Sequence, residues 1–263
     1  MKNKLILSLL GFLCVNAYSM TAEENKLFMA QAKKDLARSF PGLAQESLPL
    51  PDGGAVVVPK SHFKMATPLR AKQDLMAAEL KQNGFVKSFS TRAQFLIALP
   101  NTLDGHYNKF AGNNDVTSTH MRRSPEMIEF AFEMPSATAS DAEEIYGYAP
   151  MGNYVHKEES YNKKEGWTQG IEFFKNDQSV CAYTVNAIKL THAASNISED
   201  VATYLVNKKI TTLFAEGNDA SGYIYVVRWF DDEYFRVMEC ADLKFDHKIM
   251  EKTINMAINA DKA

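Results

Sequence analysis

The most constraining feature of this sequence is the alternation of apolar and polar residues in its C-terminal half, which predicts two β-hairpins. Residues 170–175 and 180–190 are predicted strands on either side of an Asn-Asp-Gln turn. Residues 223–230 and 233–243 repeat the pattern around Asp231-Asp232. A chain with two such hairpins needs a sheet that buries one face of each strand.

A helix is predicted after each hairpin. Ser198 is a cap for the first, which ends near Lys209 and would bury Val201 and Leu205. The second begins near Asp246, and its expected buried residues are Met250, Ile254, Ala257 and Ile258. The sequence therefore predicts an α+β fold, an antiparallel sheet with helices packed on one face, whose C-terminal half is two strand-strand-helix units.

Two of the three cysteines, Cys181 and Cys240, fall in the second strand of the two hairpins. If the hairpins share one sheet, these strands can lie side by side. Two separate buried thiols are the alternative. The third cysteine, Cys14, lies within residues 1–19, which we expect to be removed, so that two cysteines remain. We favour a Cys181–Cys240 disulfide, since an even number of cysteines in an exported chain is typical of paired thiols.

The first residues have the order of a secretory signal peptide. Lys2 and Lys4 precede an apolar run over residues 5–15, and Ala17 and Ser19 are the small residues before the expected cleavage site. We therefore expect residues 1–19 to be removed, and the mature chain to work in the periplasm or outside the cell. The run is too short to span a bilayer.

The region from residue 20 to 150 is predicted to be an N-terminal α+β region, followed by the C-terminal domain over 151–263. Helices are expected over 21–40 and 67–83, the second between Thr67-Pro68 and Gly84. Residues 41–66 are rich in Pro and Gly and hold one short strand at 56–58. Further strands are expected at 85–89, 93–99 and 127–134.

Charge and motifs limit the classes of partner. Loss of residues 1–19 changes the net charge from −3 to −5, because Lys2 and Lys4 are removed. A mildly acidic chain without a basic stripe is not typical of nucleic-acid binding. No later segment is apolar enough to cross a membrane. The common catalytic and cofactor motifs are absent, so we expect no cofactor and no metal.

Aromatic residues between positions 146 and 167 are candidates for a binding surface. They lie among Gly, Asn, Ser and Lys, a mixture typical of recognition surfaces. Packing of these rings in ordinary strands is the alternative. As a partner surface, Tyr148, Tyr154 and Trp167 would be exposed and close together. The candidate residues are Tyr146, Tyr148, Tyr154, Tyr161 and Trp167.

The segment from Pro100 to Pro125 is the weaker candidate, for a catalytic site. Loops of this length are often functional. Histidine and aspartate side chains together can bind a divalent metal or transfer protons. A solvated loop of turns is the alternative. The residues concerned are Asp104, His106, Asp115 and His120.

We therefore interpret the chain as an exported protein that binds a protein, peptide or glycan rather than catalysing a reaction. One alternative is a secreted hydrolase that uses the 100–125 loop, with or without a metal. Another is a structural or assembly factor of the cell envelope.

Overall fold

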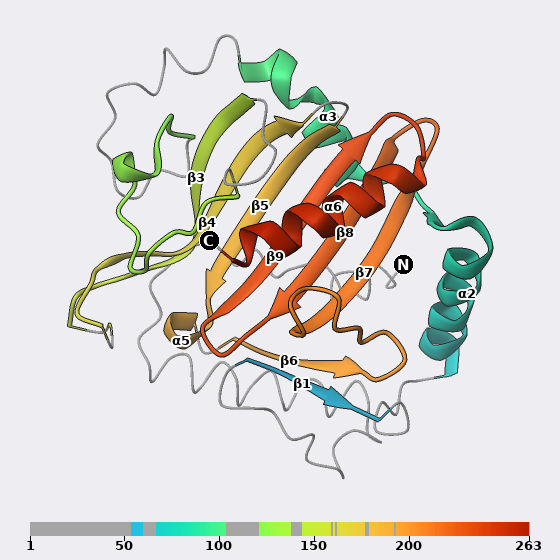
Figure 1. Ribbon diagram of the computed structural model, residues 1–263, viewed down its shortest axis with the longest axis horizontal. Coiled ribbons are helices and arrows are strands. Elements are labelled where there is room, and N and C mark those ends of the chain that lie inside the picture. The colour runs from blue at the N-terminus through green and yellow to red at the C-terminus, as the bar shows by residue number, and fades with distance from the viewer. Residues whose placement is uncertain are drawn as a thin grey trace, which may run out of the picture.

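The structure, a computed structural model, describes residues 54–59, 67–103, 121–137, 144–158, 160, 162–176, 179–191 and 193–262. Its centre is a seven-stranded sheet with the strand order β2-β7-β8-β9-β5-β4-β3 (Figure 1). Its strands are β2 (Val86–Lys87), β3 (Glu144–Val155), β4 (Gly166–Asn176), β5 (Ser179–Ala187), β7 (Ile210–Asn218), β8 (Gly222–Phe230) and β9 (Tyr234–Asp242). All neighbours are antiparallel except β2 and β7. The mixed α/β class and the two hairpins, β4–β5 and β8–β9, are confirmed.

A second sheet of two parallel strands lies beside the first. It pairs β1 (Gly54–Val58) with β6 (Ala194–Ser198) in the described residues. The short strand expected at 56–58 is therefore present. The helix expected at 21–40 lies outside the described residues, as do residues 1–19.

Helices cover both faces of the large sheet. Along β8, Tyr225 and Val227 belong to the core under α6 (His247–Ala260), whereas Ile224 and Val226 belong to the core under α3 (Thr91–Leu103). Figure 1 shows α6 in front of the strands and α3 behind them. The prediction that the helices pack on one face is therefore wrong. The remaining helices are α2 (Thr67–Asn83), α5 (Ile188–Thr191) and the 3₁₀ turn η2 (Pro125–Met127).

Helix α3 replaces the strand expected at 93–99. The run Ala-Gln-Phe-Leu-Ile-Ala-Leu is apolar enough for either element, and periodicity does not separate them. Ala93, Leu96 and Leu99 recur every three residues, as one face of a helix requires, and all three are buried against the sheet. The side chain of Ser90 accepts a hydrogen bond from the Ala93 N–H and caps the first turn.

Local end signals correctly predict α2 and the start of α6. Helix α2 has the expected bounds and is followed by Gly84 at φ +81°, a left-handed conformation that favours glycine. Asp246 caps α6 by accepting from the Lys248 N–H. The buried face of α6 is rotated about the helix axis relative to the predicted face, however. The helix buries Ile249, Thr253, Met256, Ala257 and Ala260, while Met250, Ile254 and Ile258 lie along its partly buried flank.

Three further predictions are wrong or incomplete. Residues 199–209 form turns rather than a helix, and the strand β7 follows them. The strand expected at 85–89 is reduced to β2. Residues 127–134 form no strand: Met127 ends η2, and the rest are irregular apart from a bridge between Phe130 and Trp167. The expected second strand-strand-helix unit thus begins with an additional strand.

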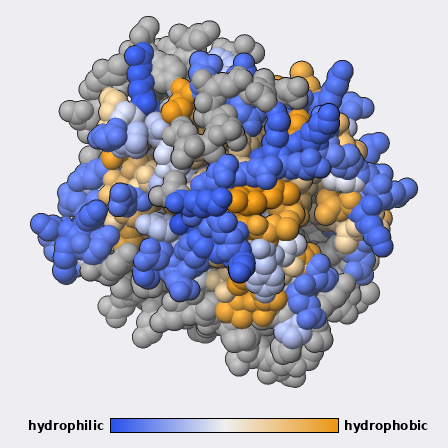
Figure 2. Space-filling model, viewed as in Figure 1, coloured by the Kyte–Doolittle hydropathy of each residue, from blue (hydrophilic) through white to orange (hydrophobic). Residues whose placement is uncertain are grey.

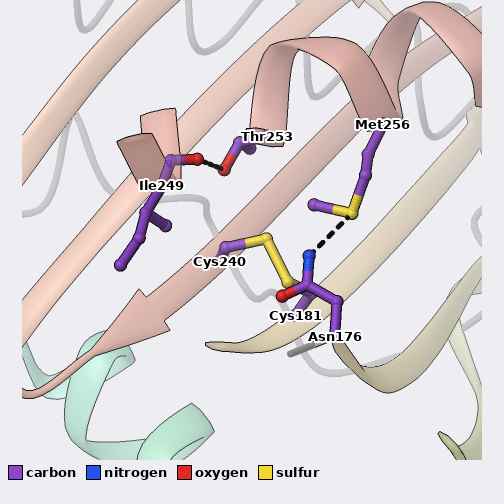
Figure 3. Close-up of a disulfide and its surroundings, with 6 residues drawn as sticks. All are labelled: Asn176, Cys181, Cys240, Ile249, Thr253 and Met256. Atoms are coloured by element: carbon purple, nitrogen blue, oxygen red, sulfur yellow. Dashed lines mark hydrogen bonds between the residues drawn. A yellow bond between two sulfur atoms is a disulfide. The ribbon is translucent and has the colours of Figure 1, made fainter. Parts of the chain in front are cut away.

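A disulfide joins the two hairpins at the middle of the sheet. Cys181 of β5 lies directly opposite Cys240 of β9, with 4.1 Å between their Cα atoms, so the predicted bond is confirmed. Both residues are fully buried. Figure 3 shows α6 beside the disulfide, where the Sδ of Met256 accepts a hydrogen bond from the Asn176 amide of β4. The disulfide closes a loop of 59 residues, which stabilises the fold by about 4 kcal/mol in the chain-entropy model.

Candidate functional site

Four of the five candidate aromatic residues are described: Tyr146, Tyr148 and Tyr154 lie on β3 and Trp167 on β4, and all but Tyr154 are buried. Tyr148 is 5% exposed and Trp167 3% exposed, and both pack with Ile128 in a small core. Tyr146 is buried on the α3 side of the sheet. The expected proximity of Tyr148, Tyr154 and Trp167 is confirmed, but the expected exposure of Tyr148 and Trp167 is wrong. Strand pairing and the cover of residues 121–137 remove these rings from solvent.

Tyr154 is the partly exposed member of this group. Its ring meets that of Trp167 edge to face, and its hydroxyl donates to Glu129 Oε2 over 2.8 Å. Burial, the hydrogen bond to Glu129 and the charge of Glu129 raise the Tyr154 pKa far above its usual value. The hydroxyl is therefore a fixed donor. Tyr161 lies outside the described residues.

The candidate catalytic segment is described only at its two ends. Helix α3 continues through Pro100 to Leu103, and the chain is described again from Met121. Asp104, His106, Asp115 and His120 lie outside the described residues. Arg122 is buried, and its backbone N–H and C=O both bond Tyr148 of β3. In the described part of the chain, no group of three or more His, Cys, Asp or Glu residues could hold a metal ion.

Three exposed apolar residues lie close together in the 199–209 loop, between β6 and β7. Val201 is 53% exposed, Tyr204 56% and Leu205 50%. Ten large hydrophobic side chains are exposed in the described residues, and three of them lie within the five positions 201–205. Single exposed hydrophobic residues are ordinary on proteins, but a cluster is typical of an interaction site.

The backbone of the 199–209 loop is held by hydrogen bonds to β7. Thr203 and Thr211 exchange both backbone bonds, at 2.7 and 2.8 Å, and the Thr203 hydroxyl donates to the Thr211 carbonyl. The Thr211 hydroxyl accepts from the Val206 N–H, and Val206 is fully buried. Three large side chains are therefore displayed on a loop with defined anchors.

Charged residues fix the end of the loop to α6 and to the β8–β9 turn. Lys209 Nζ lies 2.9 Å from an Asp231 oxygen and 2.6 Å from an Asp261 oxygen. Arg236 also pairs with Asp231, and Trp229 donates to Asp261 over 2.9 Å. Burial alone would raise the Asp231 pKa, but hydrogen bonds from Arg236, Lys209 and two backbone N–H groups hold it well below its usual value. The charges of the two cations, Lys209 and Arg236, thus balance the charges of the two carboxylates.

The 199–209 loop contacts the C-terminal end of α6, beside an apolar flank of that helix. Asn207 Nδ2 donates to the Ile258 carbonyl over 3.0 Å, which sets the loop against the C-terminal end of the helix. Figure 2 shows a band of hydrophobic residues at the centre of this face, beside the hydrophilic outer side of α6. We define the apolar strip as Val201, Tyr204 and Leu205 of the loop, Leu213 of β7, and Met250, Ile254 and Ile258 of α6.

The sequence prediction missed the apolar strip because most of its loop residues and all of its α6 residues were assigned to buried helix faces. A signal was present at Met250, Ile254 and Ile258, which recur every four residues and drift around a helix of 3.6 residues per turn. A second row at Ile249, Thr253, Met256 and Ala260 fits the helix face equally well. Only packing on the sheet decides between the two rows.

A search of known proteins provides no relative to compare with this arrangement. No family model, curated protein sequence or solved structure matches the chain.

Proposed function

We propose that this chain is an exported protein that acts by binding another protein through the apolar strip. The observation that carries the proposal is the half-exposure of Val201, Tyr204 and Leu205 on an anchored loop. These side chains stay in water although neighbouring Val206 is fully buried. A partner that covered them would gain the free energy of removing apolar surface from water, about 25 cal/mol per Å².

Anchoring of the loop favours such binding. Ordering a flexible loop on association costs free energy, and a loop that is already ordered avoids much of that cost. The bonds between Thr203 and Thr211 and the ion pairs of Lys209 supply this order. A protein or peptide fits better than a glycan, because the strip is mainly aliphatic and its one aromatic residue, Tyr204, is of a type enriched in protein interfaces.

Export rests on the sequence of residues 1–19 and is compatible with the disulfide. Disulfides persist in oxidising compartments and are rare in the cytosol. In the part of the chain that the structure describes, no helix has the length and apolar character to cross a membrane. Expressed with residues 1–19, the protein should be recovered from the periplasm with Met20 as its first residue.

The binding proposal is tested by capture from extracts of the producing cell. Immobilised wild-type protein is compared with a V201S/Y204S/L205S variant and with L243S, which changes a leucine after β9 that is 64% exposed. We expect a partner that wild type and L243S retain and the triple variant loses. Loss of one interface anchor typically costs about 2 kcal/mol, about 30-fold in affinity. Equal capture by all three proteins would contradict the proposal.

A further inference from the structure

Residues 131–137 cover the α6 side of β4 next to the helix. Phe132 and Ala137 are buried in the same core as α6, and Met134 packs against it. Gly170 of β4 makes the close approach possible, because a Cβ there would lie 2.6 Å from Met134 Sδ. The 131–137 segment therefore forms part of the wall of the core, although it belongs to no strand or helix of the large sheet.

A single carboxylate receives the polar contacts at the end of this segment. Glu172 of β4 is fully buried and accepts from the Ala137 N–H at 2.8 Å and from the Ser136 hydroxyl at 3.2 Å. The Tyr148 hydroxyl of β3 is 3.4 Å from its other oxygen. Burial and the charge of Glu172 raise the Tyr148 pKa to about 12, so this hydroxyl keeps its proton and remains a donor.

The other charged and titratable groups near Glu172 do not neutralise it by direct contact in the described structure. Tyr183 of β5 is its register partner. The positive charge of Arg236 of β9 opposes the rise of the Tyr183 pKa, but the guanidinium is paired with Asp231 and Asp261. Burial raises the Glu172 pKa above its usual value, and this effect exceeds the opposite effect of the hydrogen bonds from Ala137, Ser136 and Tyr148.

We propose that Glu172 makes the docking of the 131–137 segment depend on pH, with the segment held more tightly in acid. When the segment is docked, the carboxyl group is buried. When the segment lifts, water reaches Glu172 and its charged form is solvated. Lifting would also uncover the apolar surface beneath Phe132 and Met134. Glu172 thus couples proton loss to the exposure of a core surface.

The direction of the pH dependence follows from the two states of Glu172, buried in the docked structure and solvated when the segment lifts. Its docked pKa is raised, whereas a solvated glutamate has a pKa of about 4.3. The proton therefore contributes its full stabilisation of the docked segment below about pH 4, and this contribution is lost as the pH rises through the docked pKa. Each unit of difference between the two pKa values increases the lifting equilibrium about tenfold.

Hydrogen exchange measured by mass spectrometry at pH 4 to 7 tests the proposal. The reporters are the Ala131 N–H, which bonds the Trp167 carbonyl, and the Ala137 N–H, which bonds Glu172. Protection factors, corrected for the intrinsic exchange rate, should fall in wild type as the pH rises. In E172Q, whose amide imitates the protonated carboxyl, they should stay at the wild-type acid value at every pH.

The matched control is E133Q, which removes an exposed carboxylate from the same segment and should keep the wild-type profile. Amides of α6 report global unfolding in the same experiment and should keep their protection. Wild-type protection that is constant from pH 4 to 7 would overturn the proposal, and this measurement needs no variant. An equal fall in E172Q, or a parallel fall in α6, would overturn it as well.

Discussion

The 199–209 loop and the 144–167 region have exchanged the roles expected from their sequences. The loop was expected to bury Val201 and Leu205 in a helix, and it displays both to solvent. The 144–167 region was expected to display aromatic residues, and it buries Tyr148 and Trp167. Composition suggested the kind of side chain available in each region. The hydrogen-bond partners of the backbone decided which side chains became buried.

The loop shows how a complete set of helix signals can be overridden. Ser198, two acidic residues and two terminal lysines all favour a helix. The Ser198 carbonyl instead closes a turn by accepting from the N–H groups of Val201 and Ala202. Thr203 then pairs with Thr211 of β7, so its backbone groups are unavailable to a helix. Tertiary pairing with a neighbouring strand is stronger than local propensity here.

The largest loss of stability in these two regions is expected when Trp167 is replaced. Trp167→Ala should lower the free energy of unfolding by about 3–5 kcal/mol, because it empties a site between Tyr148, Tyr154 and Ile128. Urea denaturation followed by circular dichroism measures the change. Trp167→Phe is the control and should cost less, since it keeps a ring in the site. A loss below about 1 kcal/mol in Trp167→Ala would show that this region is an exposed surface after all.

A smaller effect is expected where the loop is anchored by charge. Asp231→Asn removes a carboxylate that faces Lys209 and Arg236, and should cost about 2 kcal/mol, reduced from the buried limit by partial exposure. The folded pKa of Asp231 is depressed, so its stabilisation is present above its ordinary pKa of about 3.9 and is lost as the pH falls through the folded pKa.

The difference in unfolding free energy between wild type and Asp231→Asn should therefore be constant from pH 7 to about 5 and shrink in stronger acid. Chemical denaturation at several pH values measures it. Asp232→Asn changes the exposed neighbour and should match wild type throughout. A difference that stays unchanged down to pH 2 would show that the ion pairs do not anchor the loop.

Those parts of the fold that depend on local signals could be predicted from the sequence. Thr67-Pro68 and Gly84 set the ends of α2, and Asp246 sets the start of α6. The disulfide was predictable because strand alternation placed Cys181 and Cys240 in equivalent strands. These features need only neighbouring residues, or one assumption about pairing.

The rest could not be predicted, because the sheet is covered on both faces. Strands that are buried on both sides lose the apolar–polar alternation that marks them, as in the β3 run from Tyr146 to Met151. The continuous apolar run of α3 is ambiguous for the same reason. The candidate site was harder still, since the apolar strip combines a loop, a strand and one flank of a helix.

The smallest effect gives the sharpest comparison, because it involves two adjacent residues. Leu205 is 50% exposed and Val206 is fully buried, although both are aliphatic and lie on the same loop. Leu205→Ala should lower the free energy of unfolding by less than about 1 kcal/mol, because little of the core is lost. Val206→Ala, the matched control, should cost about 2 kcal/mol although it removes fewer atoms. Thermal and urea denaturation measure both. If Leu205→Ala proved the more costly, Leu205 would be part of the core. The apolar strip would then keep Val201 but lose Leu205 as an exposed aliphatic residue. If the order is as expected, the leucine contributes little to folding and remains available to a partner.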